Sequence, residues 1–160
     1  RRCSYKKITK KARRTMILKK NFLSKSECGF LIENMGTVPV VEERHECTDF
    51  QLTDTILAKI TNLVQPSKPT YAIQKYEVGE SFAPHRDSLK HNLRTHSASI
   101  LLNNEFKGGK LFVKDEKITL EAGDCFLFHP HFLHWVTPVT KGTRYCFTVW
   151  GVRFGVYDYG

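Results

Sequence analysis

The 160-residue sequence lacks the features of three broad classes of protein. No apolar run approaches the roughly 18 residues that a membrane-spanning helix needs, and the N-terminus lacks the apolar segment of a secretory signal. The five cysteines form no Cys-x-x-Cys pair, and Cys125 and Cys146 lie within apolar, strand-like runs. These absences argue against a membrane protein or membrane partner, a disulfide scaffold and a structural zinc site. They favour reduced thiols in a cytoplasmic or nuclear protein.

Acidic residues are absent from residues 1–20, which hold ten lysines and arginines. The whole chain carries 25 basic and 16 acidic residues, so without those ten the remainder is close to neutral. Such a basic leader could bind nucleic acid, attract an acidic partner or act as a nuclear signal, and it could equally be a solvated, disordered tail. We expect residues 1–14 to form this leader and residues 15–160 to form one domain.

Two helices are expected in the first part of the chain, after a short apolar strand at residues 15–18. The run Ser24–Glu27 matches a capping box, in which a serine and a glutamate satisfy each other's backbone amides. A loop containing Pro39 follows, and a second helix is expected at residues 54–64, ended by Pro66. The apolar helix faces are Cys28, Leu31, Ile32 and Met35 before a stop at Gly36, and Ile56, Leu57, Ile60 and Leu63 or Val64.

From residue 71 onward the apolar pattern changes to a period of two, which is typical of β-strands. Turn signals rich in Gly and Asn separate the candidate strands. Strands are predicted at residues 71–78, 82–87, 97–102, 110–113, 117–120, 124–128, 134–137 and 144–152. Two helices followed by many short strands predict a mainly β (α+β) domain in which the helices pack against a sandwich or barrel.

Four residues of the strand-rich part have the chemistry of a metal site. Two histidines and one carboxylate hold non-haem Fe(II) and leave positions open for oxygen and a cosubstrate. His85 and Asp87 are two residues apart, so on one strand they would share a face. His134 and Arg144 would face each other in a hairpin turning through residues 138–142. We therefore predict that His134 completes the ligand set and that Arg144 binds the far carboxylate of a dicarboxylic keto acid.

Three histidines within six residues compete for the second histidine position. His129 and His131 flank Pro130 in an expected loop, whereas His134 opens a strand-like segment. A Cys/His zinc site is the alternative use of such a cluster, but no cysteine pair has structural zinc spacing. His129 and His131 are therefore expected to be rim residues, with substrate contact as the lesser alternative.

Further motifs accompany these residues in a fixed order. They are residues 21–32, Tyr76–Gly79, Pro84–Asp87, Leu101–Asn103, Phe106–Leu111, Ala122–Asp124, His134–Val139, Gly142–Tyr145 and Thr148–Trp150. Together they resemble the 2-oxoglutarate/Fe(II) dioxygenases of the prolyl 4-hydroxylase group, over roughly residues 15–151. Leu101 departs from relatives that carry a tyrosine there, so a hydroxyl that assists Arg144 would come from Ser99, Tyr76 or Thr148.

The resemblance implies a double-stranded β-helix (jelly-roll) core with two or more supporting N-terminal helices. It implies Fe(II) and 2-oxoglutarate as cofactors, with O2 as co-reactant and ascorbate as a further candidate. The residues that would bind them are His85, Asp87 and His134 for the metal and Arg144, Tyr76 and Thr148 for the cosubstrate. Trp150 would line the substrate side of the pocket, although core packing accounts for Trp150, and for Tyr76, as well.

The implied reaction is hydroxylation of a C–H bond coupled to decarboxylation of 2-oxoglutarate to succinate. The resemblance favours a prolyl residue of a protein or peptide, hydroxylated at the 4-position. An AlkB-like nucleic-acid demethylase is the alternative enzyme, to which the basic leader would be useful. Those enzymes carry a second arginine where this chain has Trp150. A catalytically degenerate binding module on the same scaffold is the third possibility, and the complete set of four residues argues against it.

Overall fold

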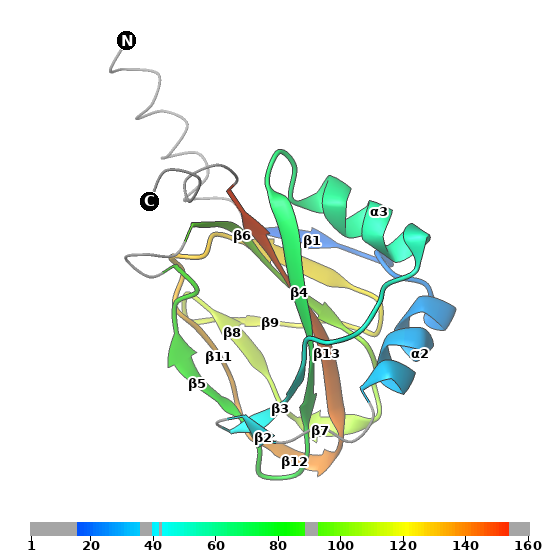
Figure 1. Ribbon diagram of the computed structural model, residues 1–160. Coiled ribbons are helices and arrows are strands. Elements are labelled where there is room, and N and C mark those ends of the chain that lie inside the picture. The colour runs from blue at the N-terminus through cyan, green and yellow to red at the C-terminus, as the bar shows by residue number, and fades with distance from the viewer. Residues whose placement is uncertain (1–15, 36–39, 42, 89–92, 154–160) are drawn as a thin grey trace.

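A computed structural model describes residues 16–35, 40–41, 43–88 and 93–153 of the chain. Two β-sheets face each other, and two helices, α2 (Lys25–Asn34) and α3 (Asp54–Leu63), cover the outer side of the larger sheet (Figure 1). The predicted mainly β jelly-roll with N-terminal helices is thus confirmed. The predicted leader, Cys3, Gly36, Pro39 and residues 154–160 lie outside the described residues.

Both sheets are antiparallel throughout. The larger sheet has the order β1 (Ile17–Lys19), β10 (Cys125–Phe128), β6 (Arg94–Leu101), β13 (Arg144–Val152), β4 (Lys68–Tyr76), β3 (Arg44–Cys47) and β2 (Val40–Val41). The smaller sheet has the order β5 (Phe82–His85), β11 (His134–Val136), β8 (Leu111–Val113) and β9 (Glu116–Ile118). A separate pair joins β7 (Phe106–Gly108) and β12 (Val139–Gly142).

Strand β13 borders two interiors because its side chains alternate between its two faces. Phe147 and Val149 join Leu31 of α2 and Ile60 of α3 in an apolar core between the helices and the larger sheet. Four residues of the other face line a cavity between the two sheets: Arg144, Cys146, Thr148 and Trp150. A second apolar core lies between the sheets beside this cavity.

Both predicted helices are confirmed. Ser24 Oγ accepts a hydrogen bond from Glu27 N at 3.1 Å, and Glu27 Oε1 accepts one from Ser24 N at 2.8 Å, so the capping box is complete. The predicted inward position of Leu57 is wrong, because this side chain is 41% exposed while Ile56 and Ile60 carry the buried face of α3. Across the described ranges, neither helix has the length and apolar character that crossing a bilayer takes.

The predicted hairpin between His134 and Arg144 is wrong. β11, which begins at His134, pairs with β5 and β8, whereas β13, which begins at Arg144, pairs with β4 and β6. Residues 139–142 form β12 and pair with β7 instead. This close pairing depends on Gly108, at which a Cβ would collide with the carbonyl oxygen of Pro138. His134 and Arg144 consequently belong to different sheets and line the cavity between them.

Several strands were not predicted from the sequence, and β3 among them borders the cavity. β2 and β3 occupy a segment that was expected to be a loop, because the Arg-His-Glu-Cys sequence of β3 has no apolar alternation. β7 and β12 were not expected either. The strand predicted at residues 82–87 ends at His85, so Asp87 lies in a bend beyond β5.

The four cysteines within the described ranges are unpaired and buried. Cys28 and Cys125 have pKa values raised to about 11 and about 12, because burial disfavours their thiolates. These thiols therefore behave as apolar core residues, as predicted from the runs in which they lie.

Candidate metal centre

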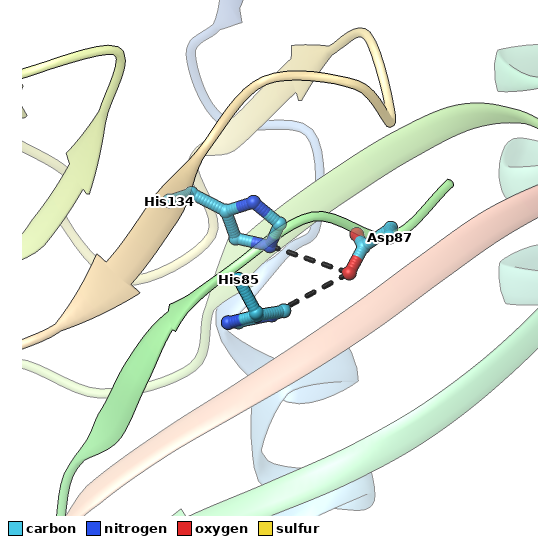
Figure 2. A group of neighbouring side chains, drawn as sticks. All are labelled: His85, Asp87 and His134. Carbon is cyan, nitrogen blue, oxygen red and sulfur yellow. Dashed lines mark ion pairs between the residues drawn. The ribbon is translucent and has the colours of Figure 1, made fainter. Parts of the chain in front are cut away.

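His85, Asp87 and His134 converge at one end of the cavity, although they come from different elements. His85 and His134 lie directly opposite each other on the paired strands β5 and β11, and Asp87 follows β5 by two residues. Asp87 Oδ1 is 3.5 Å from His85 Nε2 and 3.4 Å from His134 Nε2 (Figure 2). The three ligand atoms all lie within 4.8 Å of one another, a spacing at which one ion could contact all three.

Both histidines direct the same ring nitrogen, Nε2, toward Asp87. His85 Nδ1 lies 2.7 Å from the carbonyl oxygen of Ala83, and His134 Nδ1 lies 2.9 Å from the carbonyl oxygen of Phe132. A carbonyl oxygen only accepts, so each Nδ1 carries a proton and donates. When such an imidazole is neutral, its lone pair is on Nε2, and this is the form that binds a metal.

Asp87 is oriented by donors on its second oxygen. Ser97 Oγ donates to Oδ2 at 2.7 Å, and Trp150 Nε1 donates to the same oxygen at 3.0 Å. Burial raises the pKa of Asp87, but the neighbouring His134, His85 and Ser97 side chains together lower it by more, so the pKa lies well below its usual range. An ionised carboxylate beside two imidazoles fits a divalent ion such as Fe(II).

The bend that carries Asp87 is held by the loop that precedes β11. The backbone N–H of Asp87 donates to the carbonyl oxygen of Pro130 at 2.9 Å, and Arg86 Nε donates to that of His131 at 3.0 Å. The rings of His129 and His131 stack on each other, 5.0 Å between centroids, and neither residue lines the cavity. The structure therefore brings His134, and neither of its neighbouring histidines, to the other two ligands.

Arg144 lies in the same cavity and is 2% exposed. It stands opposite Tyr76 on the paired strand β4, and its guanidinium carbon is 5.1 Å from the centre of the Tyr76 ring. Gly109 leaves room for its stem, because a Cβ there would be 2.9 Å from Arg144 Cδ. Within the part of the chain that the structure describes, Arg144 Nε and Nη1 have no hydrogen-bond partner. A buried guanidinium with unused donors calls for an anionic ligand.

Tyr76 and Thr148 line the cavity but donate to a third residue that sequence reasoning missed. Gln74 Oε1 accepts from Tyr76 Oη at 3.2 Å and from Thr148 Oγ1 at 3.1 Å, and Gln74 Nε2 donates to Glu46 Oε2 at 3.1 Å. Burial raises the pKa of Tyr76, so its hydroxyl stays protonated. Gln74 could have been found, because it is two residues before Tyr76 on a predicted strand.

The cavity has a volume of about 160 Å³ and is lined by residues of both sheets. Trp150 lines it, and its indole N–H is directed at Asp87. Ser99, expected as a hydroxyl beside Arg144, contacts Cys146 Sγ at 3.1 Å instead. Three further lining residues that are charged were not expected from the sequence: Arg44, Glu46 and Arg94. Arg44 and Glu46 lie on the strand that was expected to be a loop, which is why no sequence signal pointed to them.

Known proteins match the part of the chain that carries these residues. The family model of the 2OG-Fe(II) oxygenase superfamily matches residues 71–151, which include the three candidate ligands and Arg144. A PKHD-type hydroxylase of Idiomarina loihiensis is 32% identical over 102 residues, covering 58% of this chain and 47% of the relative. Another, of Burkholderia ambifaria, is 33% identical over 108 residues, covering 59% and 46%. The chain thus spans about half the length of these relatives.

Solved structures share the fold. A viral collagen prolyl hydroxylase of Paramecium bursaria Chlorella virus-1, in complex with 2-oxoglutarate, superposes with a TM-score of 0.70 at 17% identity, covering 86% of this chain and 96% of that one. A Pseudomonas putida prolyl-4-hydroxylase also gives a TM-score of 0.70, at 19% identity, covering 88% and 93%. At these identities the likeness concerns the fold alone.

Proposed function

Since the chain belongs to the 2OG-Fe(II) oxygenase superfamily, we propose that it is a 2-oxoglutarate-dependent dioxygenase that hydroxylates a prolyl residue of a protein or peptide at the 4-position. One observation carries the proposal. A complete set of two histidines and one carboxylate shares a cavity with a buried guanidinium that has unused donors. A metal site alone would fit many reactions. The Arg144 guanidinium in the same cavity favours, among these, reactions that use an anionic cosubstrate.

In this proposal His85 Nε2, Asp87 Oδ1 and His134 Nε2 would hold Fe(II). When bound, Fe(II) supplies the chemistry that uses O2 to hydroxylate a C–H bond as 2-oxoglutarate becomes succinate and carbon dioxide. The protein fixes the donors beforehand: carbonyl oxygens set the tautomer of both imidazoles, and Ser97 and Trp150 set the carboxylate. Preorganised ligands of this kind raise metal affinity.

Arg144 would bind the distal carboxylate of 2-oxoglutarate. A guanidinium presents parallel N–H donors that match a carboxylate, and the buried setting strengthens the contact. Tyr76 and Thr148 would line the same end of the pocket, with Gln74 fixing both hydroxyls. Because the two hydroxyl protons are directed to Gln74, each hydroxyl oxygen can accept from Arg144 or from water.

The prolyl substrate is supported by the relatives. Structural neighbours include proteins named as prolyl hydroxylases, and one from Trichoplax adhaerens is in complex with a peptide fragment. Trp150 and Arg94 line the cavity near Asp87, and the Arg94 guanidinium carbon is 4.2 Å from the Trp150 ring centre. These two side chains would border the space that a substrate side chain enters above the metal ligands.

The test is succinate formation from 2-oxoglutarate by protein loaded with Fe(II), with and without proline-containing peptides. We expect peptide-dependent succinate and a gain of one oxygen atom on proline, located by tandem mass spectrometry. His134→Ala should abolish both signals, because it removes a ligand with a fixed Nε2. Phe112→Leu, on the outer side of the smaller sheet, is the matched control and should retain them.

Two outcomes would contradict the proposal in different ways. Oxygen found only on lysine or on a nucleobase would keep the oxygenase and replace its substrate. Succinate formation that is equal in the wild type and in His134→Ala would exclude the metal site itself.

A further inference from the structure

His85 is the less enclosed of the two candidate histidine ligands. It ends β5, a four-residue strand at the edge of the smaller sheet, and its side chain is 25% exposed against 9% for His134. β11, which begins with His134, has strand partners on both sides, and Phe128 packs edge-on against the His134 ring. An edge strand is held by one ladder of hydrogen bonds, so the His85 ring depends on other contacts for its orientation.

A β-bulge turns Phe82 toward His85. His134 lies opposite His85 and Val136 lies opposite Phe82, so two steps along β11 match three steps along β5. In a regular strand, residues three apart face opposite sides, and the extra residue removes this alternation. The Phe82 and His85 rings therefore stack, with centroids 3.8 Å apart and planes inclined by 11°. Pro84, which has no N–H to donate, falls within the bulge.

Arg44 of β3 covers the other face of Phe82. Its guanidinium carbon is 3.4 Å from the centre of the Phe82 ring. Two groups this close to a ring centre cannot share one face, so the phenyl ring lies between the guanidinium and the imidazole. Arg44 is itself 6% exposed, and its Nη2 donates to Glu46 Oε2 at 2.9 Å. The cation is thus fixed against the aromatic face, where the ring quadrupole attracts it.

The neighbours of Arg44 hold the same segment of chain. Glu43 Oε2 accepts from the backbone N–H of Ala83 at 3.0 Å, and His45 Nδ1 is 3.1 Å from Glu80 Oε2. Three consecutive residues around the start of β3 therefore contact residues 80–83, which lead into His85. These contacts link the edge of the larger sheet to the strand that carries a candidate ligand.

We propose that Phe82 and Arg44 are positioning residues for His85, on the premise that His85 is a metal ligand as proposed above. The hydrogen bond to Ala83 determines which imidazole nitrogen carries the proton. The stack fixes the tilt of the ring, and with it the direction in which Nε2 faces Asp87 Oδ1 (Figure 2). Metal affinity then depends on β3, a strand of the opposite sheet that contributes no ligand.

The test is a titration with Co(II), followed by visible absorption, which reports both affinity and ligand geometry. Phe82→Leu should weaken binding about tenfold, the lower end of what loss of a ligand-supporting contact costs. Arg44→Met, which keeps the aliphatic stem, should weaken it about threefold through loss of the cation–π contact. Both variants should also alter the Co(II) spectrum, because the His85 nitrogen is no longer fixed.

Phe112→Leu is the matched control. Phe112 stacks on Trp135 in the same sheet, with centroids 5.2 Å apart and planes 5° apart, and it lines no part of the cavity. The Phe112→Leu variant loses an aromatic stack of the same kind, but this stack involves no candidate ligand. Its Co(II) affinity and spectrum should therefore match those of the wild type. Circular dichroism melts of the metal-free proteins show whether any variant is unfolded.

Unchanged affinity and spectrum in Phe82→Leu, or an equal loss in Phe112→Leu, would overturn the positioning role while leaving the metal site in place. If Phe82→Leu does not fold, the Arg44→Met titration decides by the same criteria. A wild-type protein that binds no Co(II), or that binds it as tightly after His134→Ala, would instead overturn the proposed metal site.

Discussion

At the scale of single residues, Arg144 most directly supports the proposal that the cavity binds a ligand. A buried charge is normally paired, because burial without a partner is strongly unfavourable. Arg144 is 2% exposed, and in the described part of the chain two of its nitrogens have no hydrogen-bond partner. The Tyr76 ring beside it offers only a weak compensating contact. An anion in the cavity would supply what these nitrogens lack.

We therefore expect Arg144→Gln to raise the KM for 2-oxoglutarate by roughly 30-fold or more, because truncating one partner of a buried charged pair costs about 2–5 kcal/mol. Arg144→Lys should fall between this variant and the wild type, since it keeps the charge but loses the planar fork. The measurement is succinate formation against 2-oxoglutarate concentration. Co(II) affinity serves as the control and should not change; a KM equal to that of the wild type would exclude Arg144 as the cosubstrate ligand.

At the scale of elements, Asp124 holds the turn between β1 and α2 against the start of β10. It lies just before β10 and is 1% exposed. Its carboxylate accepts from Lys20 Nζ at 2.7 Å and from the backbone N–H groups of Asn21 and Glu121 at 3.0 Å each. Burial alone would raise the pKa of Asp124, but these hydrogen bonds lower it overall. The ionised form thus stabilises the junction between β1 and α2.

Asp124→Asn should lower the free energy of unfolding at neutral pH by about 1–3 kcal/mol. The NH2 group of the asparagine would face the N–H donors that the carboxylate now accepts from. The pKa of Asp124 is lower in the folded than in the unfolded state, so its contribution is present above pH ~4 and is lost as the pH falls through the folded value. Urea unfolding at pH 7 and pH 3 should show the variant closer to the wild type at the acidic pH.

Asp115→Asn is the control for this comparison. Asp115 lies in the exposed turn between β8 and β9 with a positive φ of 65°, a conformation that asparagine also adopts readily. Its substitution should leave both unfolding free energies nearly unchanged. A difference between Asp124→Asn and the wild type that is as large at pH 3 as at pH 7 would show that the charge of Asp124 is not the cause.

The elements also show where sequence reasoning works. Both helices and β13 were predicted because each carries strong local signals, namely caps and sustained apolar periodicity. β3 was missed because Arg-His-Glu-Cys has no such pattern, and its pairing with β4 and β2 depends on segments elsewhere in the chain. Glu46 and Arg44, which line the cavity, were missed with it.

At the scale of the whole molecule, bound metal and 2-oxoglutarate would together connect the two sheets. His85 and His134 belong to the smaller sheet, while Arg144 and Tyr76 belong to the larger one. A dicarboxylate held by the metal at one end and by Arg144 at the other would bridge the sandwich through its cavity. Any ligand that binds only the folded protein stabilises it by mass action.

We therefore predict that 2-oxoglutarate, added to protein saturated with Co(II), raises the melting temperature. At a concentration of 100 times its Kd the stabilisation is about 2.7 kcal/mol, or roughly 5–11 °C for a domain of this size. Differential scanning calorimetry should show this shift in the wild type and in Phe112→Leu, and little of it in Arg144→Gln. An equal shift in Arg144→Gln would mean that 2-oxoglutarate does not bridge the sheets.

The sequence by itself determined the fold class, the two helices and the identity of the candidate ligands, because these depend on local periodicity, caps and the chemistry of the side chains. It could not determine how His134 and Arg144 meet. The expected hairpin relied on neighbouring strands, whereas the two residues line one cavity from different sheets. Only the tertiary structure decided that arrangement, along with the bulge in β5 and the contact of Arg44 with Phe82. These features depend on strand pairing and side-chain contacts between segments far apart in the chain. The local sequence pattern of one segment does not identify the segment with which it pairs.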